Sequence, residues 1–362
     1  STLKKKRIIT MQESINEALI LAAQKNKNIV FFAQGIEDPT AVFGTLKGLS
    51  KQIERNRIIE TPVAENATCG IAIGAAMTGL IPVISFHRTE FALLAIEQIF
   101  NNAAKSHYIS KGLHSVPMLL RLIIGRGWGQ GPAHSQSLES LFSAIPGLKV
   151  IMPSFPDDAK GLIISALEDK NPFICIENRW SHYTKGNVKK GYYKSDITKP
   201  KKISKGRNIT IVSTGFMTLE VKRAVDLLKE INITVDHFDL RVLRPLLLDE
   251  IVDSVKQTGF IMCVDTGHKT LGIGSEIISF VTEKAFKHMK INPVRLGLPD
   301  HPTPSSRGLV IDFYPDTLKI LKDIFNSLKL EESLLKNFEL KIKEERNNLP
   351  IDVPDNFFKG PF

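Results

Sequence analysis

Short apolar runs alternate with longer amphipathic segments along the first half of the chain. The runs have the length and β-branched content of buried strands, and the segments between them have helical spacing. This alternation predicts a parallel sheet covered by helices on both faces, as in an α/β protein. The expected strands are Ile29–Ala33, Val83–Phe86, Met118–Ile124, Lys149–Met152 and Phe173–Ile176. The expected helices are Met11–Lys25, Asn66–Gly79, Glu90–Ser106, Gln136–Ala144 and Asp157–Asp169.

A second alternation follows and predicts a second, smaller α/β domain. Its expected strands are Ile209–Ser213, Thr234–Asp239, Phe260–Asp265 and Val294–Leu298, and its expected helices are Thr218–Glu230, Leu248–Thr258, Ile273–Ala285 and Pro315–Phe325. Residues 187–207 are basic and poor in aliphatic side chains, as is typical of a linker. We therefore expect domains over 1–186 and 208–329, with a charged tail over 330–362.

Composition narrows the class of protein. Hydrophobic residues make up 43% of the 362 residues and charged residues 24%, the balance of a soluble globular protein. No apolar run approaches the ~20 residues of a membrane span, and the N-terminus lacks the apolar core of a secretory signal. The three cysteines lie far apart, which predicts buried thiols in a reducing, cytoplasmic setting.

The net charge of +10 raises the question of a nucleic-acid partner. Much of the excess lies in the terminal segments and the linker, without the interleaved aromatic residues that stack on bases. We therefore expect neither a nucleic-acid nor a membrane partner. A surface that docks an acidic protein fits this distribution better.

Two residues are candidates for chemistry. Glu65 stands at the head of a small, apolar helical segment, where the simplest interpretation is an acid favoured by the helix dipole. His134 closes a glycine-bearing loop before a helix, where a surface or capping group is the simplest interpretation. The loop lies, however, at the sheet edge where α/β proteins bind ligands. The sequence contains no Walker loop, GxSxG, HExxH or CxxC motif.

Several stretches, in one order, resemble a known family. In the first half they are TPVAENATCGIAIGAAMTGLIPVISF, EFALLAIEQIFNNAAK and the run from GPAHSQSLESLF to FICIEN. FDLRVLRPL and VDTGHKTLGIGSEI agree in the second half. The chain resembles the β subunit of thiamine-diphosphate-dependent 2-oxo acid dehydrogenases from about Met11 to about Asp323. This resemblance implies a transketolase-like pyrimidine-binding domain followed by a transketolase C-terminal domain.

The resemblance also implies a shared cofactor site. In the family, the diphosphate and Mg²⁺ are held mainly by an α subunit with a Gly-Asp-Gly motif, and this sequence contains no such motif. The chain would therefore hold one half of the thiamine diphosphate, within a heterotetramer of two α and two β chains. The glycines of GIAIG, on the helix that Glu65 heads, would pack at an interface.

The resemblance assigns roles to individual residues. Glu65 would hydrogen-bond to the pyrimidine ring and promote ionisation of the cofactor, and His134 would donate a proton or orient the acyl acceptor. Val63, His87 and Phe91 would contact the same ring, although Phe91 also fits an ordinary core position. A monovalent cation such as K⁺ is implied on the backbone carbonyls of Met118, Ala166, Leu167, Asp169 and Asn171.

Two loops depart from the family pattern. SFHRTEF places His87 and Arg88 where an apolar residue is common, and GRGWGQG adds Arg126 and Trp128. We take these four residues as candidate substrate contacts, because added cations suit a polar or anionic substrate. Alternatively, both arginines face solvent or a partner chain.

The most direct interpretation is a β-type subunit of a two-chain enzyme that decarboxylates a 2-oxo acid and transfers the acyl group to an acceptor such as a lipoyl acyltransferase. A split transketolase, which moves ketol units between sugar phosphates, is an alternative within the enzymes. A non-catalytic scaffold that keeps the fold is an alternative outside them.

Overall fold

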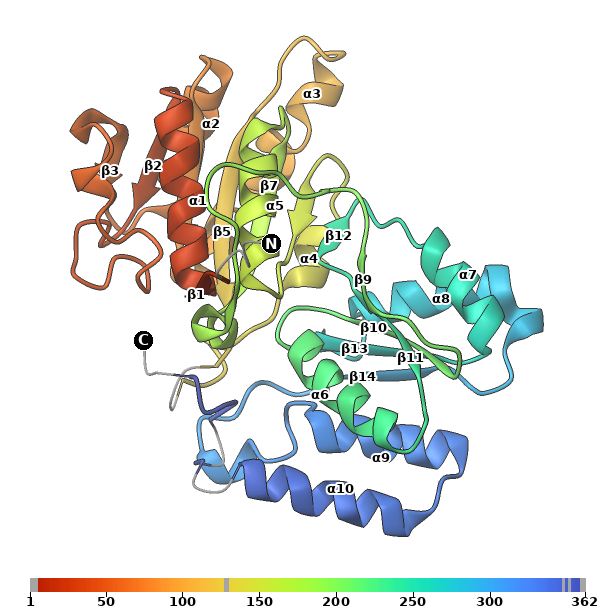
Figure 1. Cartoon of the computed structure of the whole chain (residues 1–362). Helices are drawn as coiled ribbons and strands as arrows, with labels where there is room; N and C mark the ends of the chain where they lie inside the picture. Colours follow the sequence, from red (N-terminus) through yellow and green to blue (C-terminus); the bar gives the residue numbers. More distant parts are fainter. Residues whose placement is uncertain (1–5, 127–129, 347–348, 351–352, 359–362) are drawn as a thin grey trace, which may run out of the picture.

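The computed structural model describes residues 6–126, 130–346, 349–350 and 353–358. Two α/β domains lie side by side, each built around its own sheet (Figure 1). The strands of the first domain are β1 (Ile8–Thr10), β2 (Ile29–Ala33), β3 (Ile58–Glu60), β4 (Ile81–Phe86), β5 (Met118–Ile124), β6 (Lys149–Ile151), β7 (Pro172–Asn178) and β8 (Lys185–Asn187). Its helices are α1 (Met11–Lys25), α2 (Glu65–Met77), α3 (Ser106–Ile109), α4 (Glu139–Ser143) and α5 (Pro156–Glu168).

A strand from the second half of the chain, β12 (Val242–Arg244), joins the first sheet. In the described residues this sheet has the order β12-β6-β7-β5-β4-β2-β3 and is parallel except for the pair β12–β6. Alternate side chains of β2 enter different cores: Val30 and Phe32 join the core that includes α2, and Phe31 joins the core formed with α1 and α5. Both faces are therefore buried, which explains why these strands are apolar throughout.

The second domain is built the same way. Its strands are β9 (Lys201–Ser204), β10 (Ile209–Ser213), β11 (Val235–Asp239), β13 (Ile261–His268) and β14 (Val294–Leu298), and its helices are α6 (Met217–Glu230), α7 (Asp249–Thr258), α8 (Ile273–Ala285), α9 (Thr317–Leu328) and α10 (Glu332–Glu345). The described sheet has the order β14-β13-β10-β11-β9, with only β9 antiparallel to its neighbour. The predicted α/β class is confirmed.

Local sequence signals set several element ends. Thr10 Oγ1 accepts the Glu13 backbone N–H at 3.2 Å, and Glu13 Oε2 accepts the Thr10 N–H at 2.7 Å, so a capping box begins α1 at the predicted residue. Pro156 stands in the first turn of α5, where its fixed φ suits a helix start.

Two expected helices differ from the sequence-based expectations. The expected helix over 90–106 is a 3₁₀ segment (Thr89–Ala95), a π segment (Gln98–Ala103) and the short α3. One side chain competes with the backbone here: Ser106 Oγ donates to the Asn102 carbonyl at 2.6 Å. The expected helix from Gln136 begins only at Glu139, and the Gln136 N–H is bound by Glu90 Oε1 at 2.6 Å.

The basic segment 187–207 carries more structure than a simple linker. β8 reaches into it and pairs with β1, while β9 adds an edge strand to the second sheet. β12 (Val242–Arg244) crosses the boundary in the other direction and pairs with β6 of the first sheet. Backbone pairing between β12 and β6 therefore joins the two domains, in addition to the side-chain contacts between them. Periodicity within one segment cannot reveal such long-range pairing.

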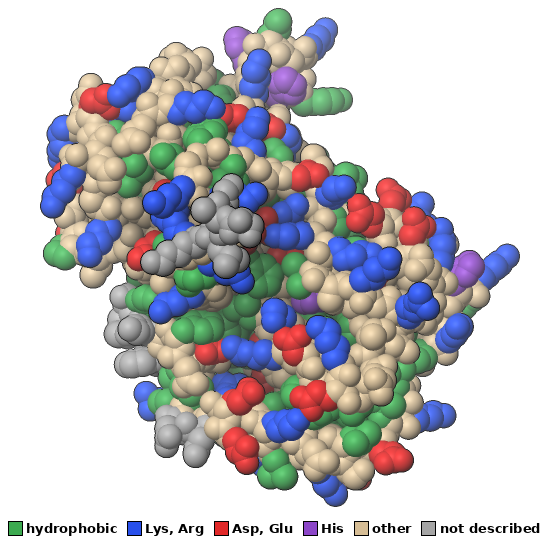
Figure 2. Space-filling model, viewed as in Figure 1, with side chains coloured by type: hydrophobic (Ala, Val, Ile, Leu, Met, Phe, Trp, Pro, Cys, Tyr) green, Lys and Arg blue, Asp and Glu red, His purple; other side chains and the backbone are tan. Residues whose placement is uncertain are grey.

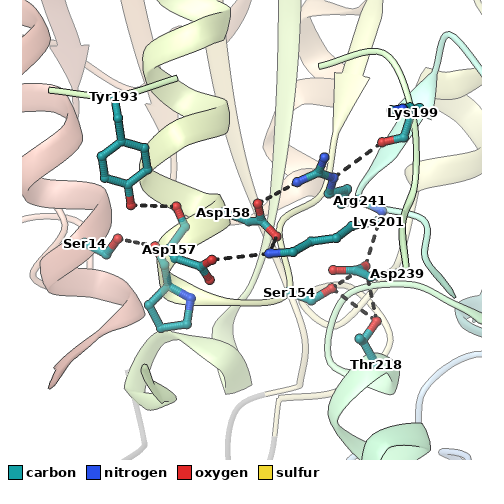
Figure 3. Close-up of polar contacts among 11 residues, drawn as sticks. Ser14, Ser154, Asp157, Asp158, Tyr193, Lys199, Lys201, Thr218, Asp239 and Arg241 are labelled. Carbon is teal, nitrogen blue, oxygen red and sulfur yellow. Dashed lines mark hydrogen bonds and ion pairs between the residues drawn. The ribbon is translucent and has the colours of Figure 1, made fainter. Parts of the chain in front are cut away.

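Figure 3 shows the polar contacts that join the N-terminus of α5 to the second domain. Asp158 is 3% exposed; its Oδ1 accepts from Arg241 Nη1 at 2.6 Å and its Oδ2 lies 2.8 Å from Lys201 Nζ. Beside it, Ser154 Oγ donates to Asp239 Oδ1 at 2.8 Å. Burial raises the pKa of Asp239 to about 7, against the hydrogen bond from Ser154.

The surface of the molecule carries charges of both signs (Figure 2). On the face drawn in Figure 2, Lys and Arg are interspersed with Asp and Glu, so the positive charge forms no uniform patch there. Around α3, Tyr108 and Leu113 are more than 80% exposed. In the part of the chain that the structure describes, no helix has the length and apolar character needed to span a bilayer.

We expect Asp158→Ala to lower the free energy of unfolding by about 3 kcal/mol, because it leaves the buried Arg241 charge without its partner. Urea unfolding measures this. The control is Asp253→Ala: that carboxylate is exposed and pairs only with Lys256, so its loss should change stability by no more than about 0.5 kcal/mol. Equal losses in the two variants would contradict the structural role of Asp158.

Candidate functional site

A narrow crevice opens at the carboxyl edge of the first sheet, where β2, β3 and β4 end. This is the edge at which open α/β sheets bind ligands. Its lining residues come from these strand ends, from α2 and from the 3₁₀ segment after β4: Phe32, Ala33, Gln34, Thr61, Pro62, Glu65, Thr68, Ile84, Ser85, Phe86, His87 and Phe91. Its cavity volume is only about 10 Å³, far below the usual ~300–1,000 Å³ of a complete small-molecule site. The crevice can therefore hold only the edge of a ligand.

Glu65 provides the carboxylate of this crevice. It is the first residue of α2 and is only 7% exposed. The N-cap of this helix is Ala64, and no side chain caps it. Within the described chain the Glu65 carboxylate accepts no hydrogen bond, although the positive end of the helix dipole favours its charge. Its lone pairs are therefore left for a donor from outside the chain.

Aromatic and imidazole rings line the walls of the crevice. His87 follows β4 and packs edge-on against Phe43, with ring centroids 5.5 Å apart. Burial lowers the pKa of His87, and the nearby charges of Arg121 and Arg88 lower it further. His87 is thus neutral at pH 7 and can donate one hydrogen bond and accept another. Phe91 adds an aromatic side chain to the lining.

Beneath His87 lies a buried ion network. Arg121 on β5 and Glu177 on β7 are fully buried and form a bidentate pair, with Nε–Oε1 2.6 Å and Nη2–Oε2 2.9 Å. Arg121 Nη1 also donates to Ser85 Oγ at 3.0 Å, and His182 Nε2 lies 3.0 Å from Glu177 Oε2. Burial disfavours the Glu177 charge, yet Arg121 and His182 outweigh it and lower its pKa to about 2. This network fixes the floor of the crevice.

His134 lies beside the crevice on an exposed loop. Its ring packs edge-on against Phe91, with centroids 5.6 Å apart. The loop is held from below by Glu90, whose Oε1 accepts the Gln136 N–H at 2.6 Å. It is held from the second domain by Thr303, whose hydroxyl donates to the Ser135 carbonyl at 3.4 Å. Glu65, His87 and Phe91 thus line one crevice, and His134 packs against the Phe91 ring without lining it. Val63, next to the lining residue Pro62, is 81% exposed.

Arg88 and Arg126, in the two loops that depart from the family pattern, are both buried. Arg88 is 3% exposed and donates to the Gly125 carbonyl and to Gln130 Oε1. Arg126 is 2% exposed and donates from Nη2 to the Ser305 carbonyl at 2.7 Å. Neither faces solvent, contrary to the alternative considered from sequence. These described contacts brace the loops around the crevice. Trp128, the fourth candidate, lies outside the described residues.

The residues of the expected cation site lie together at the opposite edge of the sheet. Met118 begins β5 and pairs in register with Pro172, close to the end of α5 where Ala166, Leu167, Asp169 and Asn171 follow one another. Asp169 Oδ2 lies 2.6 Å from Lys149 Nζ, and its Oδ1 accepts the Asn171 N–H at 2.8 Å. The Asp169 carboxylate is therefore already balanced by a cation of this chain.

Some residues that shape the site were not singled out from the sequence. Glu90 stands between Arg88 and Phe91, and burial raises its pKa. The available sequence signal was an acid inside an apolar run. The residue to which Glu90 is hydrogen-bonded, Gln136, lies 46 positions away along the chain. The Arg121–Glu177 pair gave a similar signal, since each charge interrupts a strand that is otherwise apolar. Only the register of β5 and β7 shows that the two charges meet.

Comparison with known proteins agrees with this geometry. Residues 7–183 match the transketolase pyrimidine-binding domain, and residues 199–320 match the transketolase C-terminal domain. The pyruvate dehydrogenase E1 component subunit beta of Acholeplasma laidlawii is 38% identical over 302 residues, which cover 83% of this chain and 92% of the relative. The acetoin:2,6-dichlorophenolindophenol oxidoreductase subunit beta of Bacillus subtilis is 32% identical over 327 residues, 87% and 96% of the two chains.

Solved structures share the fold. A split gene transketolase, solved as an inactive beta4 tetramer, superposes with a TM-score of 0.70 at 20% identity and covers 89% of this chain and 99% of that one. The chain belongs to the family of pyruvate dehydrogenase E1 β subunits and related 2-oxo acid dehydrogenase β subunits. The family and the two transketolase-like domains predicted from the motifs are confirmed.

Proposed function

We propose that this chain, as a member of that family, supplies the pyrimidine half of a thiamine-diphosphate site in a two-chain enzyme. The enzyme decarboxylates a 2-oxo acid and transfers the acyl group to an acceptor. The observation that carries the proposal is the Glu65 carboxylate: it is buried at a helix N-terminus and accepts no hydrogen bond from the described chain. It stands in a domain that matches the transketolase pyrimidine-binding domain.

The donor set of the crevice fits one end of this cofactor. A flat ring with a nitrogen donor matches a carboxylate acceptor, a neutral imidazole and an aromatic wall, here Glu65, His87 and Phe91. A diphosphate needs cations or helix N-terminal amides instead. The guanidinium of Arg88 beside the crevice is bound to a backbone carbonyl and to an amide oxygen. The crevice therefore suits the ring and not the phosphates.

When bound, thiamine diphosphate supplies a carbon nucleophile that attacks the substrate carbonyl and then holds the electrons released by decarboxylation. Glu65 would accept a hydrogen bond from the ring nitrogen, and its low-dielectric surroundings would strengthen that bond. Phe91 would pack on the ring, and Val63 would contact it from the rim. His134 is exposed beside Phe91, where its imidazole can hold or deliver a proton or orient the acceptor.

An α-type chain completes the site in this proposal. Val63, Ile71 and Leu94 are 81%, 64% and 66% exposed near α2 and the crevice mouth, and exposed apolar groups of this kind favour a protein cover. A Cβ added at Gly74 on the same helix would meet no atom within 4 Å, which leaves room for a close helix. We propose two α and two β chains. The described residues hold no cluster of three or more His, Cys, Asp or Glu placed for a metal, and we assign Mg²⁺ to the α chain.

The substrate is a small 2-oxo acid in this account. The cations that favoured a larger anionic substrate, Arg88 and Arg126, direct their described bonds to loop atoms. His87 is neutral and offers hydrogen bonds instead of charge. The relatives act, by their names, on pyruvate and 2-oxoisovalerate. We propose the lipoyl group of an acyltransferase as the acceptor.

The proposed function also includes a bound monovalent cation. We propose that backbone carbonyls of Met118, Ala166, Leu167, Asp169 and Asn171 hold it at the sheet edge opposite the crevice. Since Lys149 already neutralises the Asp169 carboxylate, the carbonyl dipoles would supply the ligands. Its role there is structural, because it stands far from the reacting groups along the strands.

We expect the purified chain to show no turnover alone. Mixing it with a matching α chain, thiamine diphosphate and Mg²⁺ should restore decarboxylation of a 2-oxo acid, measured with a reducible dye. A panel of pyruvate, branched 2-oxo acids and ketose phosphates then identifies the substrate class. Full activity of the isolated chain, or activity only on ketose phosphates, would contradict the proposal.

Glu65→Gln should lower kcat of the reconstituted enzyme by about 10²–10³-fold, because the amide cannot replace the charge that supports the ring. Size-exclusion chromatography should show an unchanged assembly. Glu97→Gln is the matched control, since Glu97 lies on the exposed side of the neighbouring segment. A Glu65→Gln enzyme as active as the control would support the non-catalytic scaffold.

A further inference from the structure

Two buried carboxyl groups meet across the domain boundary, next to the loop that carries His134. Glu139 is the first residue of α4 in the first domain and is fully buried. Asp265 lies on β13 of the second domain and is 4% exposed. Neither is paired with a Lys or Arg in the described structure.

The hydrogen bonds of these two carboxyl groups leave one oxygen of each group without a donor among the described residues. Glu139 Oε1 accepts from Thr266 Oγ1 at 2.9 Å. Asp265 Oδ1 accepts from Thr214 Oγ1 at 3.0 Å and from the Gly267 N–H at 3.1 Å. Glu139 Oε2 and Asp265 Oδ2 are fully buried, and no donor among the described residues reaches them. Two neighbouring buried carboxylates cannot both be ionised, so one of them carries a proton.

The surroundings decide which group holds the proton. Asp265 has two donors on Oδ1. Its Oδ2 lies 3.2 Å from the Cβ position of Gly272, the N-cap of α8, where the helix dipole favours negative charge. Glu139 has one donor. Burial, and after it the charge of Asp265, raises the pKa of Glu139 to about 8. The proton therefore resides on Glu139 at neutral pH.

The other charged groups on the packed elements face elsewhere. Arg244 on β12 donates to the Ser143 carbonyl at the far end of α4. Lys149 on β6 pairs with Asp169. Arg295 on β14 binds Ser275 and the Lys269 carbonyl. On β13 itself, His268 bonds through Nδ1 with the Pro299 carbonyl, and the Cys263 thiol is kept protonated by burial, which raises its pKa.

This pair is placed to control the His134 loop. Glu139 follows His134 by five residues, and the loop between them is held by Glu90 on one side and by Thr303 on the other. A Cβ at Gly267 would lie 2.7 Å from Glu139 Oε1, so the backbone of the second domain is in close contact with this side chain. The start of α4 is thus clamped directly against β13.

We propose that Glu139 and Asp265 share one proton and act as positioning residues: their hydrogen bond holds the His134 loop against the second domain, and loss of the proton at alkaline pH releases the loop. The proton passes to solvent, and two facing carboxylates then repel each other. The catalytic part of this inference rests on the proposed function. The shared proton itself does not.

The test uses Glu139→Gln and Asp265→Asn in the full chain, with Glu276→Gln, an exposed acid on α8, as the matched control. Each amide can donate a hydrogen bond to the remaining carboxylate without a titrating proton. Infrared difference spectra report the protonated carboxyl group, and thermal unfolding at pH 4 to 10 reports stability. Both readouts need neither cofactor nor α chain.

We expect the difference spectrum of wild type minus Glu139→Gln at pH 7 to show a carboxylic acid band, and that of wild type minus the control to show none; the protonated fraction of Asp239 is common to all these proteins and cancels. Asp265→Asn should weaken the band, because it removes the charge that adds to the effect of burial on Glu139. The folded chain keeps the proton up to about pH 8, whereas the unfolded chain releases it near pH 4.5. Relative to Glu139→Gln, the stability of the wild type should therefore fall as the pH rises from about 4.5 to about 8, and level off above. No band and parallel stability curves would overturn the shared proton.

In the reconstituted enzyme, wild-type kcat should fall about fivefold from pH 8 to pH 9, as the protonated fraction of Glu139 falls. The fall should be absent in Glu139→Gln and present in Glu276→Gln. The same alkaline fall in Glu139→Gln, with the band confirmed, would overturn the positioning role. An inactive wild-type complex at every pH would instead reject the proposed function and leave the band and stability result to decide the shared proton.

Discussion

A largely buried carboxylate at the start of a helix must be compensated, and at Glu65 the described chain supplies only part of the compensation. The helix dipole of α2 favours its charge, but no described side chain or backbone amide donates to it. The strand ends around it add aromatic, aliphatic and neutral imidazole groups. The remaining hydrogen bonds must come from water or from a ligand, and the lining of the crevice favours a flat ring. The crevice, its rim and the assignment to a shared cofactor site all follow from that incomplete compensation.

The rest of the architecture keeps the crevice and its loops in place. The Arg121–Glu177 pair holds the floor, while Arg88 and Arg126 brace the loops above it. Contacts from the second domain then position the His134 loop, through Thr303 and through the Glu139–Asp265 pair. The C-terminal domain therefore contributes to the site indirectly: it positions side chains that belong to the first domain.

Much of the fold could be predicted because its signals are local. The capping box at Thr10 and the apolar strand of β5 mark elements whose ends agree with expectation. The prediction of a single helix over 90–106 was wrong: the segment divides into 3₁₀, π and short α-helical pieces, and helical periodicity does not reveal such a division. β12 was missed because its partner lies in the other domain.

The candidate site, like the fold, could be predicted only in part. Family motifs pointed to Glu65, Phe91 and His134; Glu65 and Phe91 line one crevice, and His134 packs against Phe91. The inward direction of Arg88 could not be foreseen, since a charged residue in a loop is usually exposed. The proton shared by Glu139 and Asp265 was equally hidden, because two acids 126 positions apart become neighbours only when the domains pack.

The central claim is that Glu65 binds the ring of a cofactor whose phosphates belong to another chain. A crystal structure of the reconstituted complex with thiamine diphosphate tests it most directly. The account predicts a carboxylate oxygen of Glu65 within hydrogen-bond distance of a pyrimidine nitrogen, with the diphosphate and Mg²⁺ on the α chain. A cofactor bound wholly by one chain, or a Glu65 carboxylate facing solvent in that complex, would contradict it.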